Sequence, residues 1–316
     1  MKAIKKSLVR RTRSIAQVVA RLTVASVVLL MLVLAYGAAT PISRILVLNS
    51  DSSVAKYAEV EMAFKASIGG PTMNVDVSRV SEAQVRRTIA SSNPEVVYCI
   101  GTSAYQMAAK ATRTKPIIFS SAINWQRFPK RRRTHAIANE LPAEMQLTLF
   151  RHFFPRTKRV GVIYDRNMNR QWFGEAQKAG KEVGIEVVGY SIRRASQVDD
   201  GFRKLASEVD AFWLIPDPVV LESQTSVQRY FDLAHAARKA VFTYSPAFTA
   251  LNPALILAPD MPTIGRQAAG LAQDLDSAED SYSPAGSEVI LNLRRVQEYG
   301  LDFNRDSLDS VNQIIR

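Results

Sequence analysis

Residues 96–120 read VVYCIGTSAYQMAAKATRTKPIIFS, and this stretch decides the class of fold. Two short apolar runs, 96–100 and 116–120, stand on either side of a stretch with helical spacing, 103–111. A strand, a helix and a second strand in this order predict a βαβ unit with parallel strands. Neither apolar run alternates with polar residues, which is typical of strands that helices cover on both faces.

The same alternation extends outward in both directions along the chain. It predicts strands at 45–48, 73–77, 160–164, 186–192, 211–215, 241–244, 254–257 and 289–293, with helices at 54–67, 82–91, 171–183, 197–207, 223–238 and 263–275. Such a series is typical of an α/β protein whose mostly parallel sheets are flanked by helices.

A polar and basic stretch at 134–142 separates two such series, and we place the boundary between two lobes there. The first lobe is expected to contain residues 42–141 with 262–285, and the second 142–261 with 286–316. A chain of 316 residues has the right length for two lobes of ordinary domain size.

The first 39 residues have the layout of an export signal. A segment with seven basic residues and no acidic one leads into an uncharged apolar run, 22–36, and then into the small residues Gly37, Ala38 and Ala39. This order predicts a signal peptide cleaved after Ala39. An uncleaved membrane anchor is the alternative, because residues 22–39 approach the length that spans a bilayer. Either outcome places the body of the protein in the periplasm.

The net charge of +12 is concentrated in that segment. Without its seven basic residues the remainder carries +5, which indicates solubility and gives no reason to expect a nucleic-acid partner. The basic run 130–133 is interpreted as a solvated loop. A repressor with a DNA-binding head is excluded, because the uncharged apolar run occupies the place of that head.

Residues that could support catalysis are sparse. The single cysteine, Cys99, lies inside an apolar run and is expected to be buried and inert. The three histidines, His135, His152 and His235, lie far apart in the sequence, and no nucleophile, phosphate-binding or metal-binding motif accompanies them. The sequence therefore predicts no enzyme, no metal site and no cofactor.

Candidate binding residues follow from the rule that open parallel sheets bind ligands beyond the carboxyl ends of their strands. Residues at these positions are polar or aromatic: Asn49, Ser50, Asp51, Thr102, Ser103 and Ser121 in the first lobe, and Tyr164, Asn169, Asp217 and Tyr244 in the second. Several lead into helices, where backbone N–H groups favour an acidic ligand group. The alternative role for each polar residue is a helix cap. Asp217 is expected to accept a donor of the ligand, such as an ammonium or a ring N–H, and the competing account is that it only caps the following helix.

Seven stretches carry a resemblance to known proteins. They are ILVLNSDSS at 45–53, PEVVYCIGTSA at 94–104, KPIIFSSAI at 115–123, PRTKRVGVIYD at 155–165, VDAFWLIPD at 209–217, IGRQAAGLAQ at 264–273 and VILNLRRVQEYGL at 289–301. In this order they resemble the ABC-transporter substrate-binding family of type I periplasmic binding proteins. The resemblance implies two lobes joined by a hinge of three crossings, which close over a small ligand. It also implies that the candidate binding residues named above, with the exception of Asp51, contact the ligand.

Two departures from the family pattern bear on the ligand. The family usually has Asp-Pro shortly after the strand at 116–120, where this chain has Asn124-Trp125, and Gly-Ala-Leu where this chain has NPAL at 252–255. The lost carboxylate leaves a ligand ammonium without its usual partner, and Asp51 or Asp217 is expected to replace it.

The sequence thus predicts an exported solute-binding protein that captures an amino-acid-like or aromatic molecule and delivers it to an inner-membrane ABC permease. Its contact with the membrane itself is expected only through the N-terminal segment. The alternative is a periplasmic or anchored binding protein that reports to a sensory partner without transport. The aromatic residues Tyr57, Trp125, Trp172 and Phe248 are interpreted as packing residues.

Overall fold

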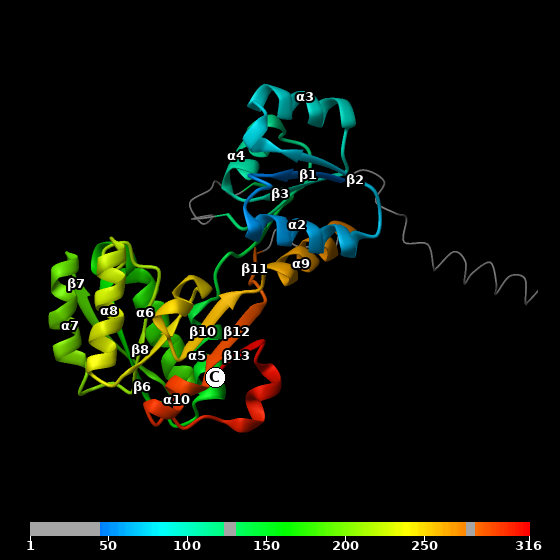
Figure 1. The fold of residues 1–316 in the computed structure, drawn as a ribbon. Coiled ribbons are helices and arrows are strands. Elements are labelled where there is room, and N and C mark those ends of the chain that lie inside the picture. Colours follow the sequence, from blue (N-terminus) through cyan, green and yellow to red (C-terminus); the bar gives the residue numbers. More distant parts are fainter. Residues whose placement is uncertain (1–44, 123–130, 276–281) are drawn as a thin grey trace, which may run out of the picture. The chain divides into compact units, whose positions relative to one another are not determined.

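The computed structural model describes residues 45–122, 131–275 and 282–316 (Figure 1). Two mostly parallel sheets flanked by helices build this part of the chain, which confirms the predicted α/β fold. The expected export segment, 1–39, and the Asn124-Trp125 pair lie outside the described residues. Within those residues, no helix is both long and apolar enough to cross a membrane.

The first sheet has six strands in the order β11-β5-β4-β3-β1-β2, and every neighbouring pair is parallel. Its strands are β1 (Ile45–Asn49), β2 (Thr72–Asp76), β3 (Val96–Ile100), β4 (Ile117–Ser120), β5 (Thr134–Ile137) and β11 (Tyr282–Ser283). Its helices are α2 (Ala55–Ile68), α3 (Glu82–Ser92), α4 (Thr102–Ala111) and α9 (Met261–Gln273).

Both faces of this sheet are covered (Figure 1). Helices α3 and α4 pack against Leu46, Leu48 and Cys99 on one face, and the ring of Tyr98 meets Phe64 of α2 on the other. Every residue of β1, β3 and β4 is buried, which explains why these runs show no polar alternation.

The second sheet has seven strands in the order β13-β12-β10-β9-β8-β6-β7. They are β6 (Arg159–Asp165), β7 (Glu186–Ile192), β8 (Ala211–Trp213), β9 (Ala240–Thr243), β10 (Leu255–Pro259), β12 (Ser287–Asn292) and β13 (Gln313–Ile315). The helices of this part are α5 (Ala143–Phe153), α6 (Arg166–Val183), α7 (Val198–Leu205), α8 (Gln224–Ala236) and α10 (Leu293–Glu298). The β10–β12 pair is antiparallel, and all other pairs are parallel.

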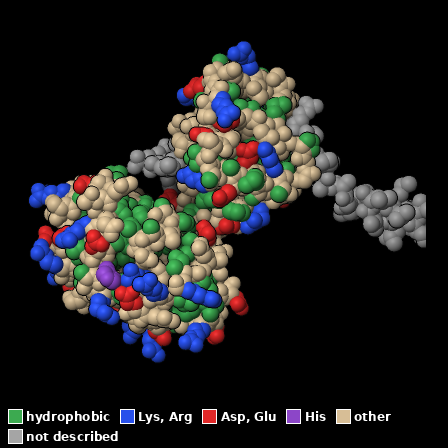
Figure 2. Space-filling view, viewed as in Figure 1, with side chains coloured by type: hydrophobic (Ala, Val, Ile, Leu, Met, Phe, Trp, Pro, Cys, Tyr) green, Lys and Arg blue, Asp and Glu red, His purple; other side chains and the backbone are tan. Residues whose placement is uncertain are grey.

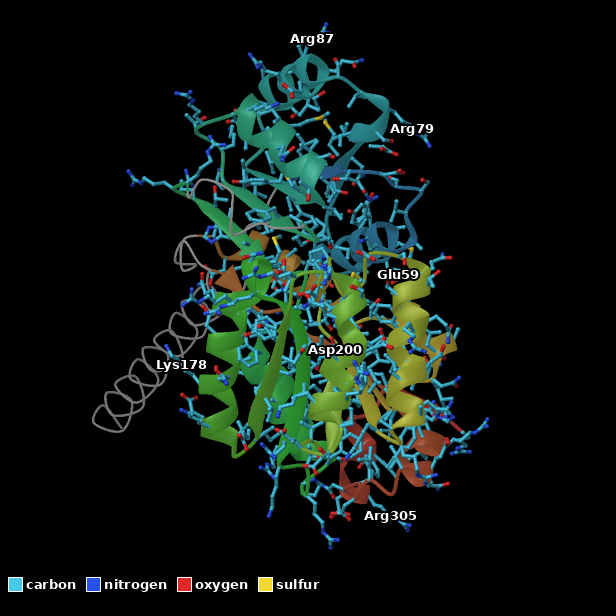
Figure 3. All side chains as sticks on the ribbon, turned by 90° about the vertical axis from the view of Figure 1, so that its left-hand side faces the viewer. Glu59, Arg79, Arg87, Lys178, Asp200 and Arg305 are labelled. Carbon is cyan, nitrogen blue, oxygen red and sulfur yellow. The ribbon has the colours of Figure 1, made fainter. Side chains whose placement is uncertain are left out.

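The core of the second sheet is aromatic. On one face Trp213 meets Phe150 of α5 edge-on at 5.2 Å, and on the other Phe212 meets Phe202 of α7 at 4.2 Å between ring centroids. Long charged side chains such as Arg87 and Lys178 extend from the outer surface (Figure 3). The pattern of apolar strands and amphipathic helices therefore places the charges in water and the rings inside.

The chain passes three times between the two sheets, after β5, after β10 and after β11. The first passage leads into α5, the second into α9, and the third from β11 into β12. This topology is the hinge of three crossings that the resemblance implies.

The basic stretch before the first passage differs from the expectation. Residues 134–137 form β5, in which His135 is buried, so the stretch 134–142, where we placed the lobe boundary, begins with a strand that was not predicted. Of the basic run, Arg132 and Arg133 are exposed as expected, whereas Arg131 is half-buried and its guanidinium donates to the carbonyl oxygens of Ala109 and Thr112 at 2.6 and 2.8 Å. It thereby satisfies carbonyls at the end of α4. Strand β5 exists because β4 and β11 pair with both of its edges.

Candidate functional site

The predicted site residues of each sheet lie at the carboxyl ends of neighbouring strands. We call the ends of β1, β3 and β4 with the residues that follow them (49–51, 101–103 and 121) the first edge. We call the ends of β6, β8 and β9 with the residues that follow them (164–169, 217 and 244) the second edge. Parallel strands that are neighbours end on the same side, so the members of each edge lie together.

The end of β1 is held by bonds within the chain. Asn49 is buried, and its amide nitrogen donates to Oε2 of Glu61 at 2.6 Å while its Oδ1 accepts the N–H of Asp51 at 3.1 Å. Asp51 accepts the N–H and the hydroxyl of Ser53 through Oδ1, at 2.9 and 2.6 Å. Asn49 is therefore committed to the fold, whereas Oδ2 of Asp51 has no hydrogen-bond partner among the described residues.

Gly101 links β3 to α4 and brings the first edge together. Its φ of +88° suits glycine, and a Cβ at this position would lie 2.5 Å from the Ser50 hydroxyl and 3.1 Å from the Tyr57 ring. Ser50 in turn accepts the N–H of Ala104 at 3.0 Å, so it caps α4 from the neighbouring strand. Thr102 and Ser103 form the first turn of α4, where the helix favours negative charge.

Ser121 follows β4 in an unusual conformation. Its φ is +55°, its side chain is fully buried, and its hydroxyl has no hydrogen-bond partner among the described residues. The preceding residue, Ser120, accepts the N–H of Gly101 at 2.8 Å, so Ser121 lies beside the start of α4. Backbone strain and an unpaired buried hydroxyl both cost free energy, and such features concentrate at functional sites.

Two substitutions separate these costs. Ser121→Gly removes both costs and is expected to raise the free energy of unfolding by about 1 kcal/mol, because glycine also adopts a positive φ without a Cβ penalty; its difference from Ser121→Ala measures the strain. Ser121→Ala keeps the strain and removes the unpaired hydroxyl, so its unfolding free energy should stay within about 0.5 kcal/mol of the unsubstituted chain or rise. Urea unfolding measures both. A loss above about 1 kcal/mol for Ser121→Ala would mean that the hydroxyl has a structural partner.

Asp217 is buried at the second edge, and its carboxylate accepts four hydrogen bonds. Oδ2 accepts the N–H of Asp165 at 2.6 Å and Nδ2 of Asn169 at 2.7 Å. Oδ1 accepts the N–H groups of Val219 and Val220 at 2.9 and 3.0 Å. A carboxylate has about four acceptor positions, so the chain itself fills them.

This geometry favours the structural alternative for Asp217 over a ligand contact. The carboxylate holds the turn at 217–221 and the start of α6; the next helix, α8, is capped by Ser223 instead. Asn169 is committed through its amide nitrogen, and Asp165 caps α6 by accepting the N–H of Asn167 at 3.1 Å. We therefore do not count Asp217 among the candidate ligand contacts.

The two tyrosines of the second edge differ in exposure: Tyr164 is buried and Tyr244 is half-buried. Tyr164 stacks on Phe173 of α6 with ring centroids 4.4 Å apart, and the half-buried Tyr244 meets Phe248 edge-on at 5.5 Å. Burial raises the pKa of both phenols, so both stay protonated at neutral pH and can donate a hydrogen bond. These residues suit a ligand with a flat apolar body.

The buried strand cysteine behaves as expected. Cys99 is fully buried in β3, and burial raises the pKa of its thiol, which disfavours the reactive thiolate. His152 and His235 are exposed on helices of the second sheet. Within the described residues, no group of three or more histidine, cysteine and acidic side chains could hold a metal ion.

Sequence reasoning missed two features of the edges. The Tyr57 ring, interpreted as a packing residue, lies over Gly101 at the first edge. Thr243, at the end of β9, is buried and its hydroxyl has no partner among the described residues. The glycine that follows β3 was a signal for Tyr57, because a close approach of another group requires glycine there. Thr243 had no such signal, because burial of its hydroxyl is a tertiary property.

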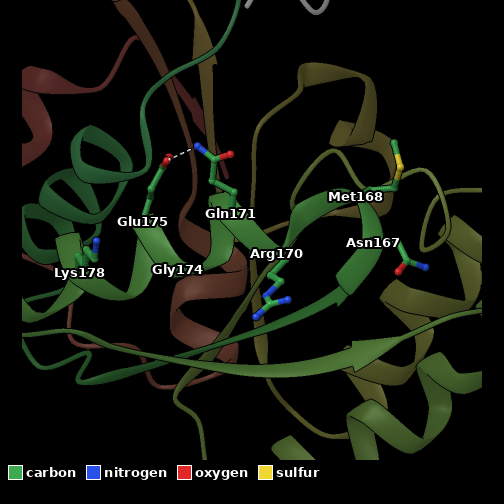
Figure 4. Close-up of a pocket in the computed structure, with 7 residues that line it drawn as sticks. All are labelled: Asn167, Met168, Arg170, Gln171, Gly174, Glu175 and Lys178. Atoms are coloured by element: carbon green, nitrogen blue, oxygen red, sulfur yellow. Dashed lines mark hydrogen bonds between the residues drawn. The ribbon is translucent and has the colours of Figure 1, made fainter. Parts of the chain in front are cut away.

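A hollow of about 530 Å³ lies along α6 and shares Asn167 and Met168 with the second edge (Figure 4). Its described lining is Asn167, Met168, Arg170, Gln171, Gly174, Glu175 and Lys178, with one hydrogen bond from Gln171 to Glu175 at 2.9 Å. All of these residues lie on one helix and none is buried, so we assign the hollow no ligand.

On the face shown in Figure 2, acidic and basic side chains are intermixed.

Comparisons with known proteins point to one family. The family model described as ABC transporter substrate binding protein matches residues 59–305. No curated protein matches the sequence. The ligand-free, open structure of CD0873 from Clostridium difficile, a substrate binding protein with adhesive properties, has a TM-score of 0.68 at 14% identity and covers 87% of this chain and 99% of its own. A conserved domain protein from Vibrio cholerae has a TM-score of 0.51 at 18% identity, covering 86% and 99%. At these identities, the two structures show a shared periplasmic-binding-protein fold.

Proposed function

Because this chain belongs to the family of ABC transporter substrate-binding proteins, we propose that it is exported and captures a small molecule between the two edges. It then delivers this molecule to an ABC transporter in the inner membrane. The two lobes are residues 42–141 with 262–285 and residues 142–261 with 286–316. A ligand that bonds to both lobes favours their closed arrangement, because it stabilises that state over the open one.

Ser121 is the observation that most supports this proposal. Its positive φ and its buried hydroxyl, which has no partner among the described residues, are two costs at one residue, beside the start of a helix that favours negative charge. A ligand oxygen that accepts from this hydroxyl would compensate for both. The hydroxyl oxygen of Ser50, which lies outside α4, accepts the backbone N–H of Ala104 and thereby fixes the start of this helix beside Ser121.

The two edges supply different chemistry for the ligand. The second edge contributes the rings and phenol groups of Tyr164 and Tyr244, which favour an aromatic ligand. The first edge contributes hydroxyl groups and Oδ2 of Asp51, which accepts no hydrogen bond from any described residue. Since the Asp217 carboxylate is filled, Asp51 is the candidate for the ammonium of an amino-acid-like ligand.

The protein acts by binding and release, without a catalytic step. Its periplasmic location and the fate of residues 1–39, cleaved or retained as an anchor, belong to the same proposal, because the basic, apolar and small residues follow the order of a signal.

A ligand screen tests the proposal. The purified full chain is heated with single amino acids, aromatic acids, purines and small carboxylates, and one class is expected to raise its melting temperature. A ligand at about 100 times its Kd adds about 2.7 kcal/mol of stability. The Ser121→Ala variant should bind the same compound about tenfold more weakly, as expected for the loss of one hydrogen bond.

Matched controls separate binding from transport. Ser91→Ala, on the exposed side of α3, should leave the affinity unchanged. Cells that lack the protein should lose uptake of the compound. Binding with undiminished uptake would support the sensory alternative, and no binding by any class of compound would contradict the proposal.

A further inference from the structure

A group of arginines follows the carboxyl ends of β6 and β7. We call it the arginine cluster, and its members are Arg166, Arg170, Arg193 and Arg194. Asp165 and Ile192, the last residues of the two strands, are partners in their parallel pairing. The residues that directly follow these two therefore start next to each other, and Arg170 is one helical turn further along α6. Four positive charges thus gather beside the second edge.

The arginine cluster has no acidic partner. Its four members are exposed, and none forms an ion pair with a described residue. The carboxylates near it are occupied: Asp165 and Asp217 are buried and accept N–H groups of the chain. Asp199 and Asp200, the next acidic residues after β7, pair with arginines further along the chain. The positive charge of the cluster is therefore not neutralised within the described residues.

Other arginines of the second sheet and its helices show the usual arrangement. Five of them pair with a carboxylate, and they are Arg156, Arg159, Arg203, Arg229 and Arg295. Like charges that stand close together repel each other, and an anion between them removes this cost. A positive region at the place where a parallel sheet binds its ligand also attracts anions from solution.

The phenol of Tyr164 adds a hydrogen-bond donor to the cluster. Only 8% of this residue is exposed, and its hydroxyl forms no hydrogen bond with a described residue. Burial raises the pKa of the phenol, and the positive charges of Arg166 and Arg170 oppose this rise, so both guanidinium groups lie close enough to act on the hydroxyl. The start of α6, a helix of 18 residues, favours negative charge at the same place.

These features describe a site for an oxyanion. We propose that the arginine cluster and the hydroxyl of Tyr164 bind an acidic group of the ligand, a carboxylate or a phosphate. A guanidinium presents two parallel N–H donors to two oxygens of such a group, and the phenol donates to a further lone pair. The inference rests on the proposed function and narrows it: the aromatic or amino-acid-like ligand is an acid whose acidic group lies at the second edge.

Thermal unfolding of the full chain with simple anions tests the site. The probes are inorganic phosphate, benzoate and benzamide, which has the shape of benzoate without its charge. We expect at least one of the two anions to raise the melting temperature, more at low than at high ionic strength, and benzamide to leave it unchanged. Phosphate and benzoate compared at equal concentration show which oxyanion the site prefers. No rise above a chloride control of the same ionic strength would overturn the proposal.

Single charge removals locate the site. Arg166→Gln and Arg193→Gln should each weaken binding of the effective anion about tenfold to a hundredfold. Without the anion, both variants should melt at the same or a higher temperature, because a repulsion is removed. Arg305→Gln is the matched control. Arg305 is exposed, has no ion pair among the described residues, and follows Asn304, which bonds to Phe153 ahead of β6, at the opposite end of the sheet (Figure 3).

The control should bind the anion like the unsubstituted chain. Equal weakening in all three variants, or none in Arg166→Gln and Arg193→Gln, would contradict the site. The screen for the natural ligand is a separate measurement. A neutral ligand found there would uphold the proposed function and overturn only the acidic ligand.

Discussion

Replacing Asp217 by alanine is expected to lower the free energy of unfolding by about 3–5 kcal/mol. The carboxylate is fully buried and accepts four donors at 2.6–3.0 Å, three of them backbone N–H groups. Alanine leaves all four without an acceptor, and hydrogen bonds to a charged group are the stronger kind. Urea unfolding of the purified variant measures the loss.

Two further substitutions show whether the number of bonds decides the effect. Asp217→Asn keeps the shape but turns an amide group toward one pair of donors, so a loss of about 2 kcal/mol is expected. Asp165→Ala removes one capping bond and should cost about 1 kcal/mol. Ligand affinity of folded Asp217→Asn should be nearly unchanged. A large loss of affinity with normal stability would restore Asp217 as a ligand contact.

Replacing Gly265 by alanine is expected to cost about 2–3 kcal/mol of unfolding free energy. A Cβ on Gly265 of α9 would lie 2.4 Å from the carbonyl oxygen of Val60 and 2.8 Å from the backbone nitrogen of Phe64. Both atoms belong to the backbone of α2, which cannot yield unless the two helices separate. Separation would also loosen Phe64 from Tyr98 in the sheet below.

Gly270 in the same helix is the control for this substitution. It is exposed, and a Cβ there would meet nothing within 4 Å. Gly270→Ala should therefore raise the unfolding free energy by up to about 1 kcal/mol, because alanine is the better helix former. Thermal and urea unfolding should give opposite signs for the two variants. Equal effects would contradict the close packing of α2 and α9.

The strands that lie inside each sheet could be predicted from local pattern. The run at 96–100 is apolar throughout because helices cover both faces, and the structure has β3 at the same residues. Strand β5 was not predictable in this way, because its four residues are held by β4 and β11 rather than by a pattern of their own. The antiparallel direction of β12 depends likewise on where the chain returns, after the third passage.

Positions in the candidate site were predictable, and the use of their side chains was not. The strand-end rule selected Ser121 and Asp217 as polar residues of the same kind. The structure distinguishes the two residues. The Asp217 carboxylate accepts hydrogen bonds from donors 48 to 52 residues earlier in the chain and from donors two to three residues later. The Ser121 hydroxyl has no partner among the described residues. Donors so distant in sequence leave no trace in local spacing.

By itself, the sequence determined the α/β class, most of the alternating strands and helices, and the ends of the strands where a ligand is expected. These properties depend on the period of apolar residues and on short-range turn chemistry, both of which act over a few neighbouring positions. Only the tertiary structure decided which strands stand at the open ends of the sheets and which polar groups are left without partners. Both depend on contacts between segments far apart in the chain, where burial and hydrogen bonding are settled by packing.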